Sequence, residues 1–249
     1  MSDLWSVETL IVGSPYSSTC TLVANDRHRV IIDSGLSLDQ SALEQALHER
    51  RLDLSDVDIV INTHLHLDHC GNNSLFPRAE VFMSRREMQW TSAFYAALFA
   101  SRTPEQAAEE FYPELRSYEF APRTIRNVVR LARLFWKPDR LGDASRRRWI
   151  ETDELPRGLE VRPSPGHTPF HVSIQVAAPA LVIVAGDAVL AEQPHAKVRT
   201  MIPYSRAAFL ATRAALMLEA ATIVPGHGPT FSAHPDSNSN GANGGTRHA

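Results

Sequence analysis

Short apolar runs rich in β-branched residues recur in the first and last thirds of the chain. In the first third, turn residues such as Gly13-Ser14-Pro15 and Asn25-Asp26 separate them. Such residues favour tight turns and therefore bound strands. The pattern predicts strands at 9–12, 19–23, 29–32, 57–61 and 80–83, and again at 159–162, 172–176, 181–184 and 222–224.

Helical spacing follows the strands in each of these two parts. Leu43, Ala46 and Leu47 form an apolar stripe after the third strand, and a second helix is predicted over 205–220. Each β-rich half thus carries a helix of its own. We expect two sheets packed face to face with helices outside, which is an α+β architecture.

Residues 84–150 follow a different pattern, with helical spacing throughout. The predicted helix faces are an aromatic stripe (Trp90, Phe94, Tyr95, Leu98, Phe99), an apolar stripe (Ile125, Val128, Val129, Ala132, Trp136) and a basic stripe (Arg123, Arg126, Arg130, Arg133). We interpret 84–150 as a helical insertion in the β-rich frame. The aromatic stripe is expected to pack onto the sheets, with an acyl-chain pocket or a homodimer contact as the alternatives.

Composition narrows the class of protein. Of the 249 residues 43% are hydrophobic, and the net charge of −3 gives no indication of binding to nucleic acid or to an anionic membrane. The two cysteines are not in a C-x-x-C pair, which favours a reducing compartment. We find neither a signal-peptide pattern nor an apolar stretch near the ~18 residues of a membrane span, and expect a cytoplasmic location. The Ser/Asn/Gly-rich tail, 232–249, is expected to be disordered.

The segment INTHLHLDHCG, at 61–71, ends the fourth predicted strand with four metal-binding side chains: His64, His66, Asp68 and His69. Imidazole and carboxylate are the usual ligands of hydrolytic zinc. Burying so many imidazoles without a cation would carry a large desolvation cost. The segment therefore indicates a metal site.

Three later strand ends repeat this arrangement. His167 lies in SPGHTPFH, Asp187 in AGDA after the run LVIV, and His227 in VPGHGP. Gly and Pro fix sharp turns, so each side chain is aimed rather than mobile. We expect the four strand ends to meet in one site at one edge of the sheets.

These four motifs, together with Asp33 in IIDSG, resemble those of the metallo-β-lactamase superfamily, in order from about residue 9 to 231. The resemblance implies an αββα four-layer sandwich with the metal site at the sheet edge. It implies one metallo-β-lactamase domain over 1–231, with the insertion 84–150 over the site.

The resemblance also implies the site residues. The ligands would be His64, His66 and His167 for a first ion, Asp68, His69 and His227 for a second, and Asp187 for both. Asp33 and His171 would support ligands rather than bind metal. Two Zn²⁺ are the first expectation, and such a ligand set also accepts iron or manganese.

The chemistry that the resemblance implies is hydrolysis by a hydroxide held between two ions, with Asp68 and Asp187 as catalytic residues. The first expected substrate is a small lactone of the N-acyl-homoserine type. A thioester, as in glyoxalase II, and a phosphodiester or nucleic acid are the alternatives, and a mononuclear iron dioxygenase or inactive sensor is a third class. Related lactonases place a substrate-facing tyrosine where this chain has Leu190, so Tyr16 and Tyr204 are candidate replacements.

Overall fold

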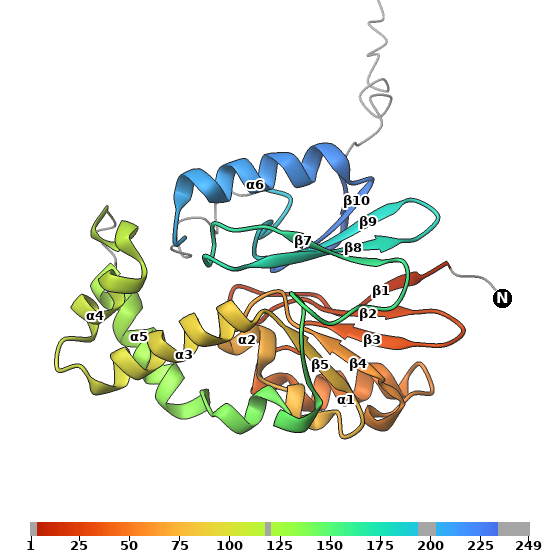
Figure 1. Cartoon of the computed structure of the whole chain (residues 1–249), viewed down its shortest axis with the longest axis horizontal. Coiled ribbons are helices and arrows are strands. Elements are labelled where there is room, and N and C mark those ends of the chain that lie inside the picture. Colours follow the sequence, from red (N-terminus) through yellow and green to blue (C-terminus); the bar gives the residue numbers. More distant parts are fainter. Residues whose placement is uncertain (1–3, 118–120, 194–202, 234–249) are drawn as a thin grey trace, which may run out of the picture.

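Two stacked β-sheets form the centre of the molecule in the computed structural model, which describes residues 4–117, 121–193 and 203–233 (Figure 1). Within these residues the first sheet has the order β1 (Ser6–Ile11), β2 (Cys20–Ala24), β3 (Arg29–Ile32), β4 (Ile59–Ile61), β5 (Glu80–Met83) and β6 (Arg147–Trp149). The second has the order β11 (Phe231–Ser232), β10 (Thr222–Pro225), β9 (Leu181–Gly186), β8 (Val172–Ala177) and β7 (Leu159–Pro163).

Alternate side chains along the strands point to opposite faces of each sheet, so each sheet has a hydrophobic layer on both faces. In β4, Ile59 and Ile61 face the core between the sheets, whereas Val60 faces the outer side of the first sheet. In β9, Val182 and Val184 belong to the same central core. Successive side chains of a strand point to opposite faces, so both faces of these sheets are covered.

Helices cover the two outer faces. Leu43 and Leu47 of α1 (Gln40–His48) are fully buried against the first sheet, and Leu216 of α6 (Arg206–Glu219) packs with Ile183 and other residues of the second sheet. In Figure 1, α1 lies below the first sheet and α6 above the second. The expected α+β, αββα sandwich is confirmed.

The stretch 84–150 contains α3 (Arg85–Ala100), α4 (Pro104–Phe111) and α5 (Ala121–Phe135), which pack together at one end of the sheets (Figure 1). Phe94, Leu98 and Ala132 are buried in their shared core, and the predicted arginine stripe of α5 is exposed. The strand β6, which was not predicted from the sequence, pairs in parallel with β5 and so ties the end of this stretch to the first sheet.

The tail, the membrane-spanning potential and the cysteines were also subjects of prediction. The predicted disordered tail, 232–249, starts too early, because Ser232 pairs with Thr222 in β11, and residues 234–249 lie outside the described residues. In the part that the structure describes, no helix has the length and apolar character needed to cross a bilayer. Cys20 and Cys70 are both free and buried, as expected for a chain without disulfides.

Candidate metal centre

The ends of four strands deliver the predicted side chains to one edge of the sandwich. His64 and His66 follow β4, and the short helix α2 (Leu67–Cys70) carries Asp68 and His69. The other three follow β7, β9 and β10. The seven side chains form two groups whose potential ligand atoms lie within 4.8 Å of one another, His64, His66, His167 and Asp187 in the first and Asp68, His69 and His227 in the second.

The carboxylate of Asp187 lies between the two groups. Its Oδ2 is 3.1 Å from Nε2 of His167 and 4.0 Å from Nε2 of His64. Its Oδ1 is 3.3 Å from Nε2 of His69 and 3.2 Å from Nε2 of His227. One oxygen therefore faces each group, which is the arrangement of a carboxylate that bridges two cations.

Hydrogen bonds to the far ring nitrogens orient the imidazoles. His69 Nδ1 lies 2.7 Å from Asp33 Oδ2, and His227 Nδ1 lies 2.6 Å from the carbonyl oxygen of Ser14. His66 differs, because its Nε2 is 2.8 Å from the Tyr112 hydroxyl and its Nδ1 faces His167. A proton held on the far nitrogen leaves a lone pair on the near one, as metal binding requires.

Asp33 joins the strand β3 to this site. Its Oδ1 accepts from the backbone N–H of Thr63 at 2.9 Å and its Oδ2 from the Thr63 hydroxyl at 2.7 Å. The residue has φ 57°, a left-handed conformation that aspartate tolerates better than most residues. Asp33 therefore connects the His69 ring to Thr63, a residue that no sequence motif marks.

His171 also has both ring nitrogens engaged by protein atoms. Its Nδ1 is 2.8 Å from the Ser164 hydroxyl, and its Nε2 accepts from the backbone N–H of Asp187 at 3.1 Å. The ring therefore carries its proton on Nδ1 and has no lone pair left for a cation. It holds the backbone of Asp187 instead.

Several polar atoms at the centre are buried without a hydrogen-bond partner among the described residues. They include both carboxylate oxygens of Asp187, Nε2 of His64 and Nε2 of His69. Buried polar groups are paired almost without exception in folded proteins, because each unpaired one has a desolvation cost. Cations between the two groups would satisfy these atoms, so the residues present fit metal ions.

The pKa values of the histidines also fit metal binding. Burial lowers the pKa of His64 and His167 well below the ordinary value and that of His66 to about 4, so all three are neutral at pH 7. Burial acts likewise on His227, but the Asp187 carboxylate outweighs it and raises the pKa of His227 to about 9. His227 is therefore protonated at pH 7, and its positive charge faces Oδ1 of Asp187, where a second cation would lie.

The sequence model of the metallo-beta-lactamase superfamily matches residues 13–227, most of the chain. The chain belongs to the metallo-β-lactamase superfamily. It is 28% identical over 213 residues to metallo-beta-lactamase domain-containing protein 1 of Xenopus laevis, an alignment that covers 81% of this chain and 67% of that protein. It is 36% identical over 65 residues to a probable metallo-hydrolase of Methanocaldococcus jannaschii, which covers 26% of this chain and about a third (32%) of that relative.

Among solved structures, the superfamily fold is shared with AidC, a dizinc quorum-quenching lactonase in complex with a product, a homoserine derivative. The TM-score is 0.58, with 15% sequence identity, over 90% of this chain and 85% of AidC. At this identity the likeness concerns the fold.

Glycine lets the loops around Asp187 pack closely. A Cβ atom on Gly226 would lie 2.0 Å from Oδ1 of Asp187. Gly186, immediately before Asp187, has φ 52°, and a Cβ there would lie 2.5 Å from the Thr63 hydroxyl oxygen. Both positions therefore exclude a side chain, which explains the glycines in the AGD and PGH motifs.

The two candidate tyrosines, Tyr16 and Tyr204, have the surroundings of a surface residue and a packing residue. Tyr16 is 82% exposed, Tyr204 packs against Trp90 at a ring distance of 6.2 Å, and Leu190 is buried. The phenol that reaches the candidate centre is that of Tyr112, at the end of α4. No short motif marks Tyr112, because its contact with His66 depends on how α4 folds back over the sheet edge.

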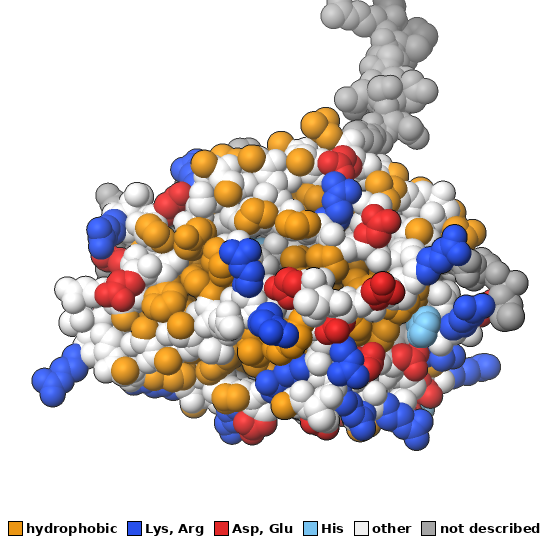
Figure 2. Space-filling model, in the orientation of Figure 1, with side chains coloured by type: hydrophobic (Ala, Val, Ile, Leu, Met, Phe, Trp, Pro, Cys, Tyr) orange, Lys and Arg blue, Asp and Glu red, His pale blue; other side chains and the backbone are white. Residues whose placement is uncertain are grey.

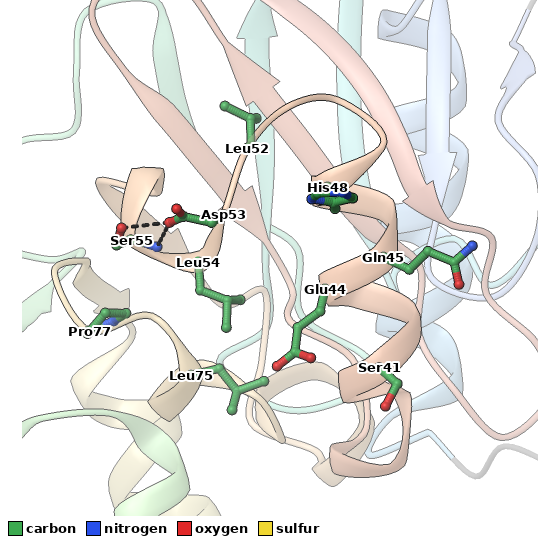
Figure 3. A pocket seen from close by; sticks show the side chains of 10 residues that line it. All are labelled: Ser41, Glu44, Gln45, His48, Leu52, Asp53, Leu54, Ser55, Leu75 and Pro77. Carbon is green, nitrogen blue, oxygen red and sulfur yellow. Dashed lines mark hydrogen bonds between the residues drawn. The ribbon is translucent and has the colours of Figure 1, made fainter.

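A separate open depression of about 710 Å³ lies beside α1 (Figure 3). Its lining includes Glu44, His48 and Asp53, and Asp53 accepts hydrogen bonds from Ser55. None of its lining residues belongs to either ligand group. The candidate centre and this depression are therefore different places on the molecule.

Proposed function

We propose that this chain is a dinuclear metal hydrolase that cleaves a small ester-like substrate, with a lactone as the first candidate. The observation that carries the proposal is the position of Asp187, with one carboxylate oxygen toward each group of imidazoles. A shared carboxylate of this kind places two ions close enough to act on one substrate.

The ligand assignment follows the two groups. His64, His66 and His167 would hold the first ion, Asp68, His69 and His227 the second, and Asp187 both. Zinc is the first choice for this mixture of imidazole and carboxylate, and iron or manganese would also suit it. When bound, the ions would supply Lewis acidity and activated water near neutral pH.

Asp68 is suited to proton transfer. Its side chain is 20% exposed, whereas that of Asp187 is fully buried. Its Oδ2 lies 3.6 Å from Nε2 of His227, and the hydroxyl of Ser18 donates to its backbone carbonyl at 2.5 Å. A carboxylate held at the rim of a buried site can orient a water and pass its proton to the leaving group.

The surroundings favour a small substrate with an apolar part. Leu67, between His66 and Asp68, packs against the buried cluster of the helical stretch that includes Tyr112, so an apolar wall adjoins the site. On the face drawn in Figure 2, hydrophobic side chains gather over α3 and α5, and charges of both signs are interspersed elsewhere. The lactonase AidC, which shares the fold, adds support for a lactone.

A phosphodiester is the second candidate, because α5 exposes four arginines: Arg123, Arg126, Arg130 and Arg133. Arg126 already pairs with Glu105 at 3.2 Å, which reduces the charge that this face offers. Binding of phosphates through several arginines would weaken steeply with added salt, whereas turnover of a neutral lactone would not.

The test combines metal content per chain with turnover of one acyl lactone, one thioester and one phosphodiester at two salt concentrations. We expect two ions per chain and turnover of the lactone that is insensitive to salt. One ion per chain would contradict the dinuclear centre. Two ions with salt-sensitive turnover of the phosphodiester alone would replace the lactone by the second candidate.

A further inference from the structure

A buried carboxylate near the start of α3 has no part in either ligand group. Glu87 is 1% exposed and lies in the first turn of the helix, where its backbone N–H donates to the Ser84 hydroxyl at 3.1 Å. The contacts of its backbone cap the helix. The contacts of its side chain lead elsewhere, to two loops that bear the metal-binding side chains.

The Glu87 carboxylate accepts hydrogen bonds from both loops. Thr168, next to His167, donates its hydroxyl to Oε2 at 2.9 Å. The backbone N–H groups of Leu65, between His64 and His66, and of Phe170 lie close enough to the carboxylate to lower its pKa. A further contact comes from its own helix, where the Thr91 hydroxyl lies 3.4 Å from Oε1.

These donors match what a carboxylate can accept. Its two oxygens have about four lone-pair directions, two of which are used by the hydroxyls of Thr168 and Thr91, and the N–H groups of Leu65 and Phe170 lie near the others. Burial raises the pKa of Glu87 to about 7, while the hydrogen bonds from Thr168 and the backbone oppose that rise. An apolar side chain would avoid this desolvation, so stability of α3 alone gives no reason for a carboxylate here.

We propose that Glu87 is a positioning residue that fixes the loop of His64 and His66 against the loop of His167, and thereby sets the metal affinity of the first group. These loops come from different sheets, one after β4 and the other between β7 and β8. Glu87 is a common anchor from a third element, α3. The inference rests on the ligand assignment given under the proposed function.

Four variants separate positioning from general stability. Glu87→Gln keeps the shape but turns an amide NH₂ toward donors, and the backbone N–H groups of Leu65 and Phe170 cannot reverse their role. Thr168→Val removes the strongest side-chain link, and Thr168→Ser restores it. Thr91→Val is the matched control, because it removes a contact to the same carboxylate from within α3.

The readout is stepwise Zn²⁺ affinity of the full chain, measured by competition with a chromophoric chelator. We expect Glu87→Gln and Thr168→Val to weaken one of the two binding steps by about 10- to 100-fold, as for other residues that orient metal ligands. A variant that combines Glu87→Gln with Thr168→Val should lose no more Zn²⁺ affinity than the more affected single variant, because both changes break the same link. Thr168→Ser and Thr91→Val should stay within about twofold of the unaltered chain.

Three results would overturn the inference. Unchanged stepwise affinities in Glu87→Gln and Thr168→Val would show that the link does not position ligands. An equal loss in Thr91→Val would assign the effect to the stability of α3. Failure of the unaltered chain to bind Zn²⁺ would remove the metal centre and the inference with it, whereas metal binding without hydrolysis would contradict the proposed reaction alone.

Discussion

At the scale of single residues, the loop of His227 packs as closely as its glycines allow. A Cβ on Gly226 would lie 2.0 Å from Asp187 Oδ1, so Gly226→Ala should displace the Asp187 carboxylate. We expect this variant to fold but to retain less than one metal ion per chain after gel filtration. In the same loop, a Cβ on Gly228 would meet nothing nearer than 3.5 Å, so Gly228→Ala should keep both ions. Equal metal content in the two variants would contradict this account.

The Tyr112 hydroxyl provides a second test at this scale. Removing it with Tyr112→Phe leaves Nε2 of His66 without its partner at 2.8 Å and frees the ring to change tautomer. Metal affinity or activity should fall by about 10- to 100-fold. Tyr16→Phe is the control for metal affinity, because the Tyr16 ring is 82% exposed and its hydroxyl loss should leave that affinity unchanged. Competition with a chelator measures both variants, and a Tyr112→Phe protein with unaltered affinity would argue against the contact.

The seven clustered side chains could be predicted from the sequence because each stands at a strand end inside a short motif. Local signals of that kind survive in a single sequence. Tyr112 and Glu87 could not be predicted, since their partners lie 46 and 81 positions away in the chain and depend on the packing of α3 and α4. The substitution at Leu190 was visible, but its burial was not.

At the scale of elements, α1 supports the first sheet from outside and is remote from the strand ends that carry ligands. Leu47 in α1 is fully buried, so Leu47→Ala should lower the free energy of unfolding by about 2–5 kcal/mol. Leu38→Ala should change it by about 0.5 kcal/mol at most, because Leu38 is 70% exposed. Urea denaturation of the metal-free chains measures both. The number of metal ions per chain should remain unchanged in both variants. Fewer ions per chain in Leu47→Ala would show that α1 supports the metal centre, contrary to our inference.

The strand β6 could not be predicted from the sequence because it depends on a tertiary contact. The strand β6 reads Arg147-Arg148-Trp149, has no apolar alternation and exists because β5 offers a parallel partner. Its pairing is a tertiary contact rather than a local preference. The apolar strands of both sheets, by contrast, were predicted to within a few residues, because their composition and turns are local.

At the scale of the whole molecule, charge balance links metal binding to pH. Burial and the nearby carboxylates leave the pKa of His227 at about 9, so this imidazole is protonated at pH 7.5 in the metal-free protein. A metal ion requires the neutral ring, and its binding should therefore release a proton. The nearby carboxylates also raise the pKa of His69 in the same group, so the affinity of the second group should rise with pH from neutrality through about pH 9. Calorimetry in buffers of different ionisation enthalpy measures the release, and His227→Ala should release less. Binding heats independent of the buffer would contradict it.

Each ligand group takes members from both sheets, with His64, His66, Asp68 and His69 from the first and His167, Asp187 and His227 from the second. A bound ion would thus act as a cross-link, closing a loop of about a hundred residues such as that from His66 to His167, which are 101 positions apart. Cross-links across long loops restrict the unfolded chain most. The sheets could then separate only as fast as the ions depart. The lifetime of the folded enzyme in a chelating environment would be governed by metal dissociation rather than by its hydrophobic core.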